Sequence, residues 1–186
     1  MARPSKVSAA DIERAALDIA RDGGMDALTA RAVADVLGVS TQPVYSTWGS
    51  MDALKARVGE LLQAEISAYL REPELNVPPM LSVGLRSIRL AQEHPQLFAL
   101  AAEWMRRALD HAPPPDVLDA MRADPRLATA TDADLTRVNA LLWIFTQGLA
   151  AMVRDGSPVT TLDIARIHLS TAGDAIIAHV ASLPDP

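Results

Sequence analysis

The sequence predicts an all-α protein. Ala and Leu dominate the composition and aromatic residues make up only 4% of the 186 residues, and this balance favours helix because strands prefer β-branched and aromatic residues. Apolar residues recur at helical spacing along most of the chain. Ser, Thr or Asp precedes many of these segments and Gly or Pro follows them, as expected of helix boundaries. No segment is a convincing strand.

The first predicted helix begins after Ser8. Asp11 stands three residues later, so the two side chains can form a capping box. Ile12 and Ala16 then follow at helical spacing. The glycines of 22–24, DGG, end the helix because glycine adopts the left-handed conformation of a helix cap at little cost.

The second predicted helix begins at Thr29 and ends at Gly38. Its spacing places Val33, Val36 and Leu37 on one face.

The stretch GVSTQPVYSTWGS contains a proline inside a very short predicted helix. Ser40 is the expected N-cap, which places Thr41, Gln42 and Pro43 at the first three helical positions and ends the helix at about Thr47. The first turn has no intrahelical partner for its amides, so Pro43 loses no hydrogen bond there. The hydroxyl of Ser40 is expected to cap the amide of Gln42.

Residues 8–48 thus read as two helices, a glycine-containing turn and a short helix, which is a helix-turn-helix unit. The second helix of such a unit presents its first residues to a DNA major groove. Ser50 is expected to cap a fourth helix over 51–72. We place the domain boundary here, with a DNA-binding domain over 1–50 and a second, larger helical domain over 51–186.

The rest of the chain is predicted to be helical. The expected helices span 78–95, 95–111, 116–123, 132–154 and 161–182. Two segments, 135–153 and 161–180, are too apolar for surface helices, and Gly148 and Gly173 allow close helix approach. We expect these segments to pack against their symmetry mates in an isologous homodimer.

Composition and charge exclude several classes of protein. The chain has no cysteine, so it contains no disulfide and no thiolate metal site. It shows no signal-peptide pattern and no apolar run of membrane-spanning length, so a cytoplasmic location is expected. The net charge is −6, and the first 60 residues carry seven Lys/Arg and eight Asp/Glu. Any DNA-binding surface must therefore arrange its cations on one face.

Residues 28–54, LTARAVADVLGVSTQPVYSTWGSMDAL, resemble the DNA-binding head of the TetR (tetracycline-repressor) family of transcriptional regulators. The resemblance covers about residues 8–55, and the rest of the chain is similar only in helix pattern and length. It implies an all-helical homodimer with a three-helix head and a larger ligand-sensing body. It also implies a four-helix dimer bundle formed by the last two long helices of each subunit.

Two positions depart from the family pattern. Thr47 stands where His is common, and Met51 stands where Lys is common. The family residues contact phosphate at both positions, so their absence weakens the expected grip on the DNA backbone. Lys55, one turn further along, can compensate.

The DNA-binding candidates surround the short helix. Gln42 can pair with adenine and Thr41 can contact a thymine methyl group, whereas Tyr45 is expected at a phosphate. Thr29 and Arg31 lie at a helix N-terminus, which favours an anion. The full set of candidates is Thr29, Arg31, Thr41, Gln42, Tyr45, Thr47 and Lys55. The alternatives are solvated polar side chains in a first turn and, for Arg31, an exposed salt bridge.

A basic arm before the first helix, formed by Arg3 and Lys6, is as plausible as a disordered tail.

The ligand-binding candidates are the large side chains of the body, together with two polar residues that could anchor a ligand. They are His94, Phe98, Trp104, Met105, Met121, Trp143 and Gln147. Each apolar one also fits an ordinary core position, but an apolar pocket with few polar groups is typical of small-molecule sites.

The sequence therefore predicts a ligand-responsive transcriptional regulator, in the first place a repressor. Its expected partners are a palindromic double-stranded DNA operator, a largely apolar small-molecule effector and a second copy of the chain. A helical protein-interaction adaptor that has lost operator binding is the alternative, and a helical enzyme is the least favoured reading. We assign no catalytic residue, no metal ligand, no cofactor and no membrane partner.

Overall fold

The computed structural model describes residues 7–74, 76–108, 113, 115–156 and 161–182. Within these ranges all regular secondary structure is α-helical, which confirms the predicted fold class. The chain forms two compact units that divide after Ser67, called here the first unit and the second unit. Arg3 and Lys6 lie outside the described residues.

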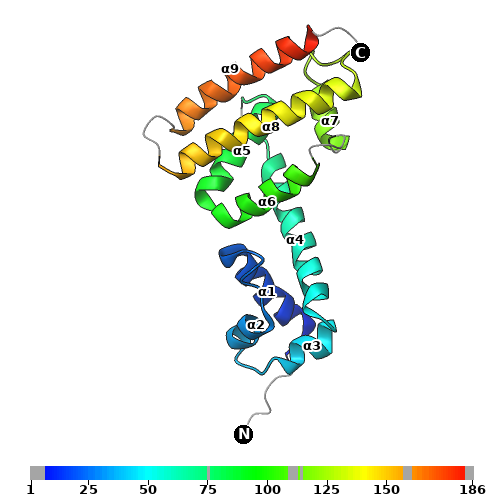
Figure 1. The fold of residues 1–186 in the computed structure, drawn as a ribbon, viewed down its shortest axis with the longest axis vertical. Coiled ribbons are helices and arrows are strands. Elements are labelled where there is room, and N and C mark those ends of the chain that lie inside the picture. The colour runs from blue at the N-terminus through cyan, green and yellow to red at the C-terminus, as the bar shows by residue number, and fades with distance from the viewer. Residues whose placement is uncertain (1–6, 75, 109–112, 114, 157–160, 183–186) are drawn as a thin grey trace. The chain divides into compact units, whose positions relative to one another are not determined.

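The first unit begins with three helices, α1 (Ala9–Gly23), α2 (Ala30–Leu37) and α3 (Gln42–Trp48), drawn from blue towards cyan in Figure 1. All three pack on one another. Their shared core consists of small and medium apolar side chains that solvent does not reach. These include Ile12, Ala16, Leu28, Val33 and Val44.

Helix α1 begins as predicted. The Ser8 hydroxyl accepts the amide hydrogen of Asp11 at 3.1 Å, and the Asp11 carboxylate accepts the amide hydrogen of Ser8 at 3.1 Å. Two amides that have no intrahelical partner are thus satisfied reciprocally, which confirms the capping box.

Helix α2 has the predicted ends. The Thr29 hydroxyl accepts the amide hydrogen of Ala32 at 3.1 Å, and Gly38 takes the left-handed conformation at φ +66°. Val33 is buried, whereas Val36 is 62% exposed. The buried face is centred on Ala30, Val33 and Ala34, and Val36 lies beyond its edge.

Helix α3 begins one residue later than predicted. Thr41, not Ser40, is the N-cap, and no side chain caps the helix. The Thr41 carbonyl accepts the amide hydrogens of Val44 and Tyr45 at 3.2 and 3.4 Å. The prediction that Ser40 caps Gln42 is therefore wrong. Pro43 still falls in the first turn, where its missing amide removes no helical hydrogen bond.

Helix α4 (Met51–Arg71) is capped by Ser50 as predicted, because the Ser50 hydroxyl accepts the amide hydrogen of Ala53 at 3.1 Å. Two ion pairs join it to α1. Arg21 contacts Glu65 at 2.7 Å, and Arg57 contacts Glu13 at 2.9 Å. Most of α4 therefore belongs to the first unit, which explains why the units divide after Ser67 and not at residue 50.

The second unit contains the end of α4 and five further helices. These are α5 (Pro79–Glu93), α6 (Pro95–Ala108), α7 (Pro115–Arg122), α8 (Asp132–Arg154) and α9 (Leu162–Ala181). Their order and bounds follow the prediction closely where they are described; the expected end of the sixth helix at 109–111 lies outside the described residues. Helix α5 packs against α6, α8 and α9, and α8 and α9 run alongside each other (Figure 1).

One apolar cluster joins α7, α8 and α9. Its buried members are Met121, Leu127, Leu135, Val138, Ile177 and Val180. Arg126, between α7 and α8, contacts Asp124 at 2.6 Å and Asp174 of α9 at 2.7 Å. The Arg126 guanidinium, which donates hydrogen bonds to Asp124, lowers the pKa of that carboxyl. This set of contacts holds the α7–α8 connection on α9.

Candidate functional site

Helix α3 presents polar side chains to solvent along one face. Thr41, Gln42 and Tyr45 are exposed, and the Tyr45 residue is 49% exposed. Val44 is buried and anchors the opposite side of the helix. At about 100° per residue, the three exposed residues lie within roughly a third of the helix circumference, so they form one surface.

Two further DNA-binding candidates lie near this surface but outside it. Thr47 is exposed and lies about 140° around α3 from Gln42. Lys55 is half-buried on the second turn of α4. Neither side chain contacts the exposed face of α3 through any hydrogen bond or ion pair within the described residues.

The start of α2 carries the remaining candidates. Thr29 is exposed, and its hydroxyl serves as the N-cap of α2. The side chain of Arg31 is 89% exposed, and its Nε lies 3.8 Å from Asp35 Oδ2. This is a long ion pair in water, and such pairs contribute little, so Arg31 can exchange Asp35 for another anion.

The other arginines among the described residues of the first unit are already paired. Arg14 contacts Asp11 at 2.8 Å, and Arg21 and Arg57 contact carboxylates of α1 and α4. Among the described residues of this unit, Lys55 is the cation without an ion pair. Most of these cations would therefore have to leave a carboxylate partner in order to bind a DNA phosphate.

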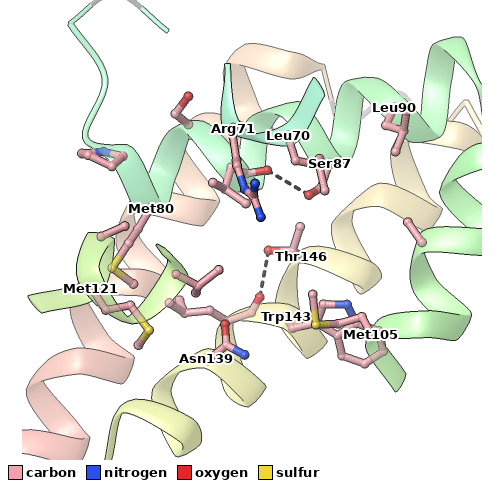
Figure 2. A pocket seen from close by; sticks show the side chains of 18 of the residues that line it. Leu70, Arg71, Met80, Ser87, Leu90, Met105, Met121, Asn139, Trp143 and Thr146 are labelled. Carbon is pink, nitrogen blue, oxygen red and sulfur yellow. Dashed lines mark hydrogen bonds between the residues drawn. The ribbon is translucent and has the colours of Figure 1, made fainter. Parts of the chain in front are cut away.

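The second unit contains a cavity of about 300 Å³. Its walls come from the end of α4, from the α4–α5 connection and from α5, α6, α7 and α8, and Figure 2 shows its lining. This volume lies at the small end of the range of roughly 300–1,000 Å³ for ligand sites. Apolar side chains make up most of the lining.

Five of the seven ligand-binding candidates line this cavity. They are Phe98, Met105, Met121, Trp143 and Gln147. His94 and Trp104 do not line it. His94 is exposed at the end of α5, and Trp104 precedes Met105 by one residue, which turns it about 100° around α6. The cavity lining thus includes four of the five predicted large apolar side chains and excludes Trp104 and the predicted histidine.

Sequence reasoning missed two helical faces and one cation. Helix α8 lines the cavity with Asn139, Leu142, Trp143, Thr146 and Gln147, and α5 lines it with residues at a similar spacing. The spacing of three, four, seven and eight residues on α8 is visible in the sequence and could have identified this face. The cation is Arg71, at the end of α4.

The hydroxyl groups of the lining are engaged within the protein. Ser87 and Thr146 each donate a hydrogen bond of 2.8 Å to the carbonyl four residues earlier, at Val83 and Leu142 (Figure 2). Ser82 accepts the amide hydrogen of Glu74 at 3.1 Å. Among the described residues, the amides of Asn139 and Gln147 form no hydrogen bond, so they remain available to a ligand.

Comparison with known proteins identifies the first unit. Residues 12–58 match the family described as bacterial regulatory proteins, tetR family. This match supports a regulator of the TetR family. The match spans most of α1, all of α2 and α3 and the early part of α4. No curated protein and no solved structure gives a significant match to the chain.

The match at residues 12–58 indicates a DNA-binding transcription regulator. Within the described ranges, no three His, Asp or Glu side chains gather where they could hold a metal ion. Over the same ranges, no helix has the length and apolar character needed to cross a membrane.

Polar contacts connect the end of α4 and the following residues to α5. Arg86 contacts Glu72 at 2.9 Å, and Arg89 contacts Glu74 at 3.3 Å. The Arg86 guanidinium also lies 5.1 Å from the centre of the Tyr69 ring. These contacts connect the last turn of α4 and the residues that follow it to α5.

The Tyr69 hydroxyl adds a further contact, because it donates a hydrogen bond of 3.3 Å to Glu93. Burial, followed by the charge of Glu93, raises the pKa of Tyr69. The phenol is thus held in its neutral, donating form.

Proposed function

We propose that the protein is a homodimeric, ligand-responsive transcriptional repressor that leaves a palindromic operator when a small molecule fills the cavity. The observation that carries this proposal is the path of α4. One end of this helix packs in the TetR DNA-binding unit, and its last residues, Leu70 and Arg71, line the cavity. A protein of this kind acts where the chromosome lies, in the cytoplasm.

The exposed face of α3 is suited to reading bases in a major groove. Gln42 can form two hydrogen bonds with adenine, and Thr41 can contact the methyl group of thymine. Tyr45 can donate to a phosphate, and Arg31 can exchange Asp35 for a phosphate at the N-terminus of α2. Thr47 and Lys55 are assigned to the DNA backbone at the edges of this surface.

The proposed coupling between ligand and DNA passes through α4. A ligand wedged between α5 and α8 changes the position of α5, and the ion pairs of Arg86 and Arg89 transfer that change to the end of α4. The two binding events then oppose each other with a coupling free energy that is the same in both directions. Operator DNA must therefore weaken ligand binding by the factor by which ligand weakens operator binding.

The proposed dimer uses α8 and α9. Helix α8 exposes a stripe of large apolar side chains, namely Leu141, Ile144, Phe145 and Met152, with Gly148 among them. Helix α9 exposes Ile167 at 63%. Large apolar side chains gathered on one face indicate a protein interface. If a two-fold axis runs beside this face, α8 and α9 of the two subunits form the four-helix bundle that the family resemblance implies.

A second candidate is a helical adaptor that no longer binds an operator. The pairing of most arginines in the first unit favours it, as do Thr47 and Met51 at positions where the family commonly has His and Lys. Both readings use the same fold, so only DNA binding separates them.

A gel-shift assay with genomic fragments between about 50 and 200 mM salt distinguishes the two functions. Non-specific binding is electrostatic and falls steeply over this range, whereas specific binding exceeds it by roughly 10³–10⁷. The repressor predicts that a few fragments remain bound at the higher salt concentration. Uniform loss of every fragment would favour the adaptor.

A further inference from the structure

The lining of the cavity in the second unit is poor in charge. Among the described residues that line it, no side chain is a carboxylate, and the charged side chain is that of Arg71. Arg71 already has an interaction of its own within the protein. An ionised group of a ligand would therefore lose its water without gaining an uncommitted counter-charge, which costs free energy. The cavity consequently favours an uncharged ligand.

Helix α8 contributes two side-chain amides to this lining, those of Asn139 and Gln147. Both residues are half-buried, and neither amide forms a hydrogen bond within the described part of the chain. The hydroxyl hydrogens of Ser87 and Thr146, in contrast, are donated to backbone carbonyls. A primary amide carries both a carbonyl acceptor and N–H donors. The two amides can therefore accept from a ligand and donate to it.

The two amides lie on the same stripe of α8. Asn139, Trp143 and Gln147 follow one another at intervals of four residues, and Figure 2 shows Asn139 and Trp143 on this helix. At 1.5 Å per residue the amides are roughly 12 Å apart along the helix axis, with the indole of Trp143 between them. The cavity thus combines apolar walls with a planar, neutral hydrogen-bonding group at each end of one stripe.

We infer that the effector is an uncharged molecule with a compact apolar body and a carboxamide-like group, bound through paired hydrogen bonds by Asn139 or Gln147. A group with an adjacent donor and acceptor matches the donor and acceptor of either side chain. This inference rests on the proposed function, since it specifies the chemistry of the ligand at the same cavity. It makes Asn139 and Gln147 specificity-determining residues.

Three probes with one alkyl chain test the charge of the ligand: octanamide, octanoate and octylammonium. Propylbenzene serves as an apolar probe without a hydrogen-bonding group. Binding to the full chain is measured without DNA and below micelle formation, by tryptophan fluorescence, because Trp143 lines the cavity. We expect octanamide to bind at least about tenfold more tightly than either ion, since each ion must lose more hydration.

Variants of matched shape test the two amides. The double variant Asn139→Leu/Gln147→Met should weaken octanamide binding by about three- to tenfold, as expected for the loss of neutral hydrogen bonds. Propylbenzene should still bind it, which shows that the cavity is intact. The two single variants show which amide binds the head group.

Gln92→Met is the matched control, because it makes the same chemical change at an exposed residue of α5 that does not line the cavity. It should leave the affinities for all four probes unchanged. An equal loss of octanamide binding in Gln92→Met would contradict the assignment to α8.

Two further kinds of result would overturn the inference. If octanoate or octylammonium binds as tightly as octanamide, if propylbenzene alone binds, or if the double variant binds octanamide as tightly as wild type, the selectivity is not that of an uncharged amide. The cavity is then still a ligand site, and the proposed function stands without this inference. If none of the four probes binds, the inference and the ligand-binding part of the proposed function both fail.

Discussion

Two exposed serines, Ser40 and Ser50, precede helices in similar sequence contexts, and only one acts as a cap. The Ser50 hydroxyl accepts the amide hydrogen of Ala53, whereas no side chain caps α3. Ser50→Ala should therefore lower the free energy of unfolding by about 0.5–2 kcal/mol. Ser40→Ala should lower it by less. Urea denaturation of the two variants measures the difference, and equal losses would contradict the assignment of the caps.

Pro43 is predicted to be almost neutral for stability. It occupies the second position of α3, where its fixed backbone angle suits a helix and its missing amide has no partner. Pro43→Ala should change the free energy of unfolding by about 1 kcal/mol or less, through the entropy of the unfolded chain. A thermal melt measures this change. A strong gain in stability would show that the proline strains α3.

The ion pair of Asp124 predicts a pH dependence of stability. Hydrogen bonds from Arg126 lower the pKa of Asp124 in the folded protein, while the unfolded value stays near about 3.9. The contribution of this carboxylate is therefore present above about pH 4 and disappears as the pH falls through the folded pKa. Asp124→Asn should be less stable than wild type at about pH 6, and the gap should narrow towards about pH 3. Urea midpoints across this range provide the test; a gap that widens in acid would refute it.

Contacts of single residues could be predicted from the sequence when both partners lie close together in the chain. The capping box of Ser8 and Asp11 was readable because both partners lie within one turn. The N-cap of α3 was not, since Thr41 takes a helical backbone conformation that its side chain does not reveal.

At the level of single helices, substitutions in α3 should distinguish contacts to DNA bases from contacts to the DNA backbone. Gln42→Ala should relax base choice by about 1–3 kcal/mol if the side chain pairs with adenine. Tyr45→Phe should instead weaken binding to all sequences alike, because phosphates carry no base identity. Affinities for operator and for random DNA measure both effects. A loss confined to the operator in Tyr45→Phe would contradict the phosphate assignment.

The lining of the cavity shows what helix patterns could and could not predict. Phe98, Met105 and Trp143 were predicted because large apolar side chains are few in this chain. Arg71 was not, because it ends α4 and its position at a cavity depends on how α4, α5 and α8 pack together. His94 was predicted as a polar anchor, but it ends α5 and faces solvent.

For the whole molecule, the exposed apolar stripe on α8 predicts a dimer, and one charged side chain introduced into this stripe should dissociate it. Ile144→Glu should shift the protein towards a monomer, since it places an unpaired charge in the proposed interface. Val36→Glu is the matched control, because Val36 is 62% exposed and Ile144 is 56% exposed, but Val36 lies in the first unit. Light scattering at micromolar concentration measures the mass. A monomeric wild type, or equal effects of the two changes, would contradict the interface.

The order of the helices and the DNA-binding motif were predictable from the sequence because caps, breakers and apolar spacing are local signals. The division between the units was not. It depends on ion pairs such as Arg57–Glu13, which join residues 44 positions apart in the chain. Such contacts between distant residues leave no periodic signal.

Selection of binding sites from a pool of random DNA duplexes tests the central claim most directly. The purified protein is mixed with the pool at about 150 mM salt, and bound duplexes are recovered over several rounds and sequenced. The account predicts an inverted repeat with half-sites about one helical turn apart, as a two-fold pair of reading helices requires, and the same selection with Gln42→Ala should lose base preference within each half-site. Recovery of no common motif, or of a motif without two-fold symmetry, would contradict it.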